Sequence, residues 1–192
     1  MKKIMLGLAA AGLCTLAPLP KFSQAAFAGT LEDGLTAYEA GNNAEAASLF
    51  RKAADEGDTR AYLNLGIFYE HGTGVPQSYA NAFFWTLKAA ESGDVNGQFN
   101  VANMYSKGQG TTQSKLEATS WYRKAANQGN ISAQYNMGVH YYMGIGVTKS
   151  VADAKIWFEK AAAQGDVQAA SALKTIRREQ AKEFNEQLKN EH

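Results

Sequence analysis

A 36-residue internal repeat restricts this 192-residue chain to very few folds. Trp85 recurs at this interval as Trp121 and Trp157. The same interval separates the members of six further series, which are Ala53/Ala89/Ala125/Ala161, Gly57/Gly93/Gly129/Gly165, Gly72/Gly108/Gly144, Gly74/Gly110/Gly146, Asn64/Asn100/Asn136 and Tyr69/Tyr105/Tyr141. A fixed period in this range is typical of stacked-repeat architectures.

Each repeat is predicted to form two helices. From Thr59 to His71, apolar residues recur at helical spacing, and Asp58 is the predicted N-cap. Gly72-Thr73-Gly74 ends this helix, and a second helix from about Tyr79 to Ser92 stops at Gly93, a residue suited to a left-handed C-cap. A single helical hairpin cannot cover its own apolar face, so we expect the hairpins to stack.

Side-chain size also alternates with the repeat. Gly66, Ala102 and Gly138 share one position, where a small residue lets a neighbouring helix cross in contact. The tryptophans are expected to fill the wider gaps between helices, because protein interiors are close-packed.

The first 28 residues are predicted to be a signal peptide. Met1-Lys2-Lys3 is basic, residues 4–16 are uncharged and mostly apolar, and Ala26-Phe27-Ala28 is a small-x-small cleavage site. Cleavage after Ala25 is an alternative. Proline and lysine interrupt the apolar run before the roughly 20 residues that a membrane helix needs, so no integral membrane segment is expected after cleavage.

The predicted mature chain is nearly neutral. Removing residues 1–28 takes away three lysines and leaves 16 basic against 18 acidic residues, a net charge of −2. This balance argues against a nucleic-acid partner. The only cysteine, Cys14, lies in the removed segment, so neither disulfides nor thiol chemistry are expected.

The repeat pattern resembles that of the Sel-1-like family, a relative of the tetratricopeptide repeat. The resemblance is carried by the pattern Ala133-x-x-Asn136-Met137-Gly138-x-x-Tyr141-x-x-Gly144-x-Gly146-Val147, followed by Ala154-x-x-Trp157-Phe158-x-Lys160-Ala161-Ala162-x-x-Gly165. It implies an all-α fold, a right-handed α-solenoid of antiparallel helix hairpins. The predicted units are a signal peptide (1–28), a partial N-terminal hairpin (29–58), three repeats (59–94, 95–130 and 131–166) and a C-terminal capping helix (167–192).

The capping helix begins in the repeat register and then leaves it. Ala172 replaces the repeated asparagine, and Arg177 replaces the repeated tyrosine. We expect an apolar stripe formed by Leu173, Ile176, Phe184 and Leu188.

Resemblance to tetratricopeptide proteins implies that the first helix of each repeat lines a concave groove. The predicted peptide-binding residues are Arg60, Leu63, Asn64 and Ile67, then Phe99, Asn100 and Asn103, then Tyr135, Asn136, Val139 and Tyr142. The repeated asparagines have two interpretations. Their amides can pair with the backbone of an extended peptide, or they can satisfy loop carbonyls between repeats.

Three patterns allow a chemical interpretation, and each has a simpler one. The Gly-x-Gly loops follow helices rather than strands, so they are predicted to be turns rather than phosphate cradles. Ser171-Ala172-Leu173-Lys174 matches the serine-x-x-lysine box of penicillin-interacting enzymes but lacks the partner motifs. His71, His140 and His192 lack metal-ligand spacing and are predicted to be exposed or capping residues.

These patterns favour a non-enzymatic binding protein without cofactor or metal. The leading prediction is a periplasmic or secreted adaptor that binds a protein or peptide segment in the groove. Two alternatives remain open. One is a binder or hydrolase of cell-wall material or β-lactams, by analogy with cysteine-rich secreted members of the family, and the other is a secreted factor that engages host proteins.

Overall fold

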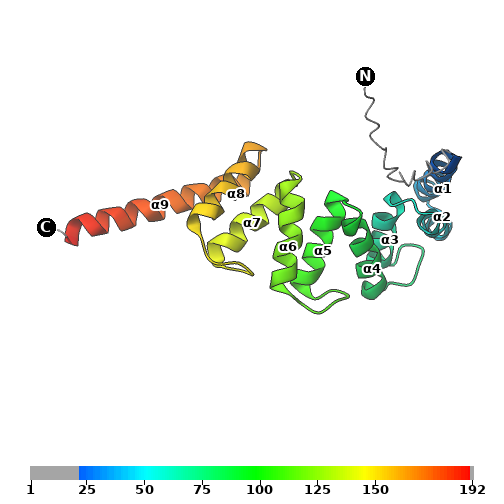
Figure 1. Cartoon of the computed structure of the whole chain (residues 1–192), viewed down its shortest axis with the longest axis horizontal. Helices are drawn as coiled ribbons and strands as arrows, with labels where there is room; N and C mark the ends of the chain where they lie inside the picture. Colours follow the sequence, from blue (N-terminus) through cyan, green and yellow to red (C-terminus); the bar gives the residue numbers. More distant parts are fainter. Residues whose placement is uncertain (1–21, 191–192) are drawn as a thin grey trace, which may run out of the picture.

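The computed structural model describes residues 22–190, which form nine helices and no strand (Figure 1). The helices are α1 (Phe22–Glu39), α2 (Asn43–Asp55), α3 (Arg60–His71), α4 (Tyr79–Glu91), α5 (Val95–Lys107), α6 (Lys115–Asn127), α7 (Ile131–Met143), α8 (Val151–Ala163) and α9 (Val167–Asn190). The predicted helix pairs are therefore present in all three full repeats.

The hairpins follow one another in a row from α1 to α9, as Figure 1 shows. Helices adjacent in sequence make nearly all of the contacts between helices of the described chain. The buried apolar residues form three clusters along the row, around Phe50, Met137 and Phe158. This arrangement confirms the predicted all-α solenoid.

Caps and glycines determine where the helices begin and end. Ser150 precedes α8, and its hydroxyl accepts a hydrogen bond from the Asp153 backbone N–H; equivalent serines precede α4 and α6. Gly144 ends α7 with φ of +74°, a left-handed conformation that favours glycine. The predicted N-cap of α3, Asp58, was wrong by one residue, because Thr59 is the N-cap. Asp58 nevertheless accepts a hydrogen bond from the Arg60 backbone N–H.

The close helix crossings occur where small residues were predicted. A Cβ atom added to Gly138 would collide with the ring of Phe158 on α8, and one added to Gly66 would collide with Thr86 on α4. Trp85 and Trp121 are buried, and Trp157 is half-buried. The Lys124 ammonium lies 3.5 Å from the centre of the Trp121 ring, so the lysine covers the outer face of the indole.

The second glycine of each Gly-x-Gly loop has a packing role that we did not predict from the sequence. A side chain at Gly146, in the loop between α7 and α8, would collide with the Lys115 carbonyl and the Thr119 hydroxyl of α6. The loop backbone therefore lies directly against the start of the preceding hairpin's second helix, which fixes one repeat on the next.

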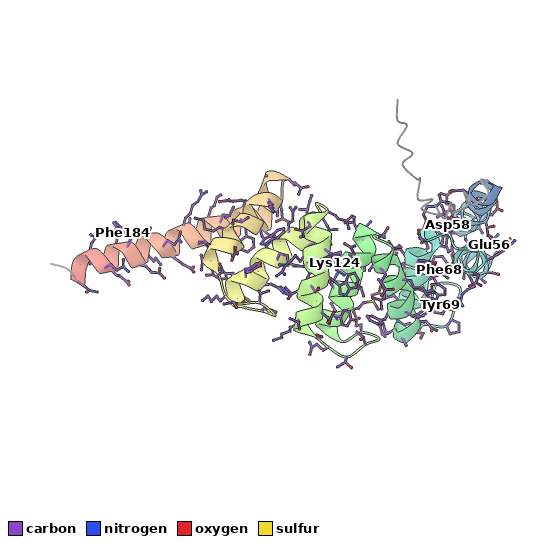
Figure 2. All side chains as sticks on the ribbon, viewed as in Figure 1. Glu56, Asp58, Phe68, Tyr69, Lys124 and Phe184 are labelled. Carbon is purple, nitrogen blue, oxygen red and sulfur yellow. The ribbon has the colours of Figure 1, made fainter. Side chains whose placement is uncertain are left out.

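Helix α9 is only half packed. Leu173 and Ile176 are buried against the preceding hairpin, as predicted. Phe184 and Leu188 are 60% and 42% exposed, so the predicted apolar stripe does not cover the core along its whole length. Figure 2 shows Phe184 on the part of α9 that extends past α8. The prediction was wrong for this half, because it extends past α8 and every described residue after Ile176 is exposed.

The predicted signal peptide lies mostly outside the described residues. Both predicted cleavage positions, after Ala25 and after Ala28, fall within the first turns of α1, and the buried Leu31 and Ala37 follow them. Cleavage stays a prediction. None of the helices in residues 22–190 is long and apolar enough to cross a membrane.

Candidate functional site

The eleven predicted binding residues lie on helices α3, α5 and α7, the first helices of the three full repeats. We call the surface that they form the odd-helix face. Arg60 and Ile67 are exposed, and the other nine side chains are half-buried. They recur at intervals of three and four residues along each helix, so those of one helix share one side.

Arg60 is already engaged at the N-terminal end of this face. One guanidinium nitrogen, Nη2, lies 2.6 Å from Asp58 Oδ2, and the other, Nη1, lies 3.4 Å from Glu32 Oε1 on α1. The hydrogen bond from Arg60 lowers the pKa of Asp58. The arginine therefore links α1 to α3, and its charge is largely balanced by these two carboxylates.

Three asparagines of the odd-helix face, Asn64, Asn103 and Asn136, make hydrogen bonds within the protein. The Asn64 amide donates to the Arg60 carbonyl of its own helix at 3.4 Å. Asn103 Oδ1 on α5 accepts a hydrogen bond from the Tyr122 hydroxyl of α6 at 2.5 Å. Burial raises the pKa of Tyr122 to about 12, although a hydrogen bond from Asn136 on α7 opposes this rise. The Tyr122 hydroxyl thus connects two neighbouring repeats.

These contacts leave part of each amide unused. An asparagine side chain has two N–H donors and an acceptor oxygen, and each bond described above uses one of these groups. The amides therefore have a structural role and keep capacity for a bound ligand. None of the bonds described here joins a repeated asparagine to a loop carbonyl, since Asn64 binds a carbonyl of its own helix and Asn136 interacts with Tyr122. Peptide binding by these amides stays a prediction.

A cleft lies at the C-terminal end of the odd-helix face. We call it the α7–α9 cleft, and its volume is about 200 Å³. It is lined by Tyr135, Val139, Tyr142 and Met143 of α7, Phe158 of α8, and Ala172, Thr175 and Ile176 of α9. Three of the predicted binding residues, Tyr135, Val139 and Tyr142, therefore share one mostly apolar cleft.

Carboxylates of α9 lie beside this cleft. The Tyr142 hydroxyl donates a hydrogen bond to Glu179 Oε2 at 2.6 Å. This hydrogen bond, together with the negative charges of Glu179 and Glu183, raises the pKa of Tyr142. The Lys149 ammonium lies 6.0 Å from the centre of the Tyr142 ring. The cleft therefore has an apolar interior and a charged rim.

A network of glutamine side chains links the repeats and was not predicted from the sequence. Gln128 donates to the Gln98 side-chain carbonyl at 2.8 Å, and Gln164 donates to that of Gln134 at the same distance. Both glutamine pairs are related by the 36-residue interval, which was the signal that could have revealed them. Each pair lies within one repeat, and its second member extends the network to the preceding repeat: Gln98 donates to the Ala90 carbonyl at 3.3 Å, and Gln134 donates to the Ala126 carbonyl at 3.2 Å.

His140 was predicted to be exposed or capping, and this was wrong. Its side chain is buried on α7, and its Nδ1 lies 2.6 Å from the Thr119 hydroxyl of α6. Burial lowers the pKa of His140. The equivalent residues of the other repeats, Met104 and Phe68, are apolar and buried, so the repeat register already indicated an interior position.

The remaining chemical motifs lie in settings that suit structural roles. Gly72, Gly108 and Gly144 end helices in left-handed conformations. Ser171 and Lys174 are both exposed on α9. Within residues 22–190, no group of three or more His, Cys, Asp or Glu side chains is placed to hold a metal ion.

Comparisons with known proteins identify the repeat. A family model described as Sel1 repeat matches residues 25–58, 59–94, 95–130 and 131–166. A search of curated proteins found no match.

Solved structures resemble this fold. One is c5321, a protective antigen present in uropathogenic Escherichia coli strains that displays an SLR fold. The TM-score is 0.72, the sequence identity is 41%, and the match covers 77% of this chain and 32% of c5321. Another is a Sel1 repeat protein from Oxalobacter formigenes, with a TM-score of 0.68 and 34% identity over 72% of this chain and 57% of that one.

The cysteine-rich protein B of Helicobacter pylori shows likeness in fold alone, with a TM-score of 0.51 and 24% identity over 64% of this chain and 93% of that one. The chain thus spans about a third of the Escherichia coli protein and somewhat more than half of the Oxalobacter protein.

Proposed function

The chain belongs to the Sel1 repeat family, and from this premise we propose that it is an exported adaptor that binds a protein or peptide segment on the odd-helix face. Proteins built from Sel1 repeats are generally scaffolds for protein–protein interaction. The proposed place of action is the periplasm or the cell exterior, because residues 1–28 have the pattern of a signal peptide.

One observation carries the binding proposal. The odd-helix face contains half-buried aromatic residues, among them Phe99 and Tyr135, and ends in the apolar α7–α9 cleft. Aromatic side chains are prominent among the residues that anchor protein partners. Their partial exposure leaves apolar area that a partner can remove from water.

The arrangement of polar groups favours binding over catalysis. Nucleophilic catalysis needs a nucleophile within hydrogen-bonding reach of a base, together with donors that stabilise the developing negative charge. Thr119 and His140 bring a hydroxyl within reach of a base, but both side chains are buried, so a substrate cannot reach them in this structure. The proposal therefore assigns no catalytic residue, metal or cofactor.

Affinity capture tests the proposal. The full chain, expressed with a C-terminal tag and its own N-terminus, serves as bait in a periplasmic extract. The Phe99→Ala/Tyr135→Ala double variant is expected to lose a protein that the wild type captures. The matched control is Tyr79→Ala/Phe84→Ala, which removes two exposed aromatic residues from the even-numbered helix α4. Equal capture by all three proteins would refute binding on this face.

Mass spectrometry of the exported protein tests its predicted processing. Cleavage after Ala28 leaves a mature chain that begins at Gly29, and cleavage after Ala25 leaves one that begins at Ala26. A chain that keeps its first residues and stays in the cytoplasm would contradict the proposed place of action.

A second candidate is a secreted factor that engages host proteins. It is supported by the likeness to c5321, which is described as a protective antigen of uropathogenic Escherichia coli. Capture from host serum and mucosal fluid, with the same variants, distinguishes this partner class from a periplasmic one.

A further inference from the structure

The α7–α9 cleft has the size and lining of a pocket for one large apolar side chain. Its volume is about 200 Å³, and Val139, Phe158 and Ile176 supply apolar walls. An apolar cavity of about 150 Å³ is enough to hold benzene. A single phenyl or branched aliphatic group can therefore fill the cleft.

The row of residues that continues the cleft along α9 is acidic. Ala172 and Ile176 line the cleft, and the same side of the helix then carries Glu179, Glu183 and Glu186, at intervals of three and four residues. Glu179 accepts a hydrogen bond from Tyr142, and the charge of Glu183 acts on the same hydroxyl. Both carboxylates therefore lie close to the cleft.

Nearby basic groups balance these charges only in part. Helix α7 contains no Lys, Arg, Asp or Glu. Lys149 lies beside the Tyr142 ring, and α9 itself carries Lys174, Arg178, Lys182 and Lys189 on the side next to the glutamates. The side of α9 that continues the cleft thus carries three carboxylates, and the facing helix offers them no cation.

We propose that the α7–α9 cleft binds a peptide segment in which a bulky apolar residue lies next to lysine or arginine residues. The apolar side chain fills the cleft, and the basic residues lie along Glu179, Glu183 and Glu186. This inference rests on the proposed adaptor function and specifies the chemistry of its partner. Apolar burial and the attraction between opposite charges both contribute to the affinity, and the charges also set the orientation and raise the rate of association.

Fluorescence anisotropy with two labelled nonapeptides tests this inference on the full chain. One peptide has a central phenylalanine followed by three lysines, and the other has glutamates in place of the lysines. The lysine peptide is expected to bind at least about tenfold more tightly, and added salt should weaken its binding. Equal binding of the two peptides, or binding of neither, would overturn the inference.

Two variants locate the binding site. Thr175→Trp fills the cleft from an exposed position, and Glu183→Lys reverses one charge of the acidic row. Each is expected to weaken binding of the lysine peptide by about tenfold or more. The matched controls are Thr112→Trp and Glu91→Lys, at exposed positions on a loop and at the end of α4, and neither should change the binding.

The capture experiment separates failure of this inference from failure of the adaptor function. In one outcome, Thr175→Trp and Glu183→Lys still capture the partner, but Phe99→Ala/Tyr135→Ala does not. This outcome would overturn the cleft as the binding site and leave the adaptor function standing. Loss of the partner with the first two variants, while their controls keep it, supports the cleft.

Discussion

The third repeat and helix α9 begin alike and end differently. Ala133 and Met137 of α7 are buried, and so are the equivalent Ala169 and Leu173 of α9. After this turn the two helices diverge. Helix α7 ends at Gly144 and turns into α8, whereas α9 continues to Asn190, with every residue after Ile176 exposed.

One substitution explains much of this difference. Gly138 allows Phe158 to pack on the α7 backbone, but Lys174 occupies the equivalent position of α9. A lysine side chain there favours solvent over a crossing helix, because burying its charge is costly. The comparison shows that the repeat ends where small residues and tyrosines give way to charged ones, even though helix propensity persists.

The largest expected difference between the two regions is the loss of stability when an aromatic side chain is removed. Trp121→Ala removes a side chain that is 8% exposed and should lower the free energy of unfolding by about 3–5 kcal/mol. Phe184→Ala removes one that is 60% exposed and should change it by less than about 0.5 kcal/mol. Urea denaturation measures both values, and equal losses would show that α9 is packed along its whole length.

Leucine at the position shared by Gly138 of α7 and Lys174 of α9 should affect the stability very differently in the two helices. Gly138→Leu forces a side chain against Phe158, and overpacking of this kind costs about 1–3 kcal/mol or more. Lys174→Leu, at the equivalent exposed position of α9, should be nearly neutral. Thermal denaturation of the two variants gives the comparison. An unchanged melting temperature for Gly138→Leu would refute the observed helix crossing.

The buried His140 should make the stability of the packed region depend on pH. Burial lowers its pKa in the folded state, so protonation favours the unfolded chain. The free energy of unfolding should therefore be constant with respect to this group above the unfolded pKa of about 6.5. Below that pH it should fall by up to about 1.4 kcal/mol per pH unit, until the folded-state pKa is reached.

His140→Met isolates this effect, because methionine occupies the equivalent position of the second repeat. The variant should lose the slope between the two pKa values, whereas His71→Gln, at an exposed position of α3, should keep it. Parallel pH profiles for wild type and His140→Met would show that this histidine is not the cause.

Most of the fold could be predicted, because the repeat fixes the lengths of the helices and the sizes of the side chains where they cross. The interval that relates Trp85 to Trp121 also predicts which helices pack. The site was harder to predict, since the role of an asparagine depends on its neighbours. Tyr122 binds Asn103 and interacts with Asn136, and only the stacking of three helices brings these residues together. The α7–α9 cleft was not predicted, although three of its residues were, because Ala172, Thr175 and Ile176 of α9 complete its lining.

Removing the exposed half of α9 should have only a small effect on stability. Deletion of residues 181–192 removes Phe184 and Leu188, whose side chains lie largely in water, and leaves the buried Leu173 and Ile176 in place. Solvent-exposed segments contribute little to global stability, so the free energy of unfolding should change by less than about 1 kcal/mol.

The deletion also removes Glu183 and Glu186, so binding of the lysine peptide should weaken although the fold persists. A large loss of stability would instead mean that this half of α9 packs on the rest of the chain or on a second copy in solution, and analytical ultracentrifugation of the wild type would distinguish these two cases.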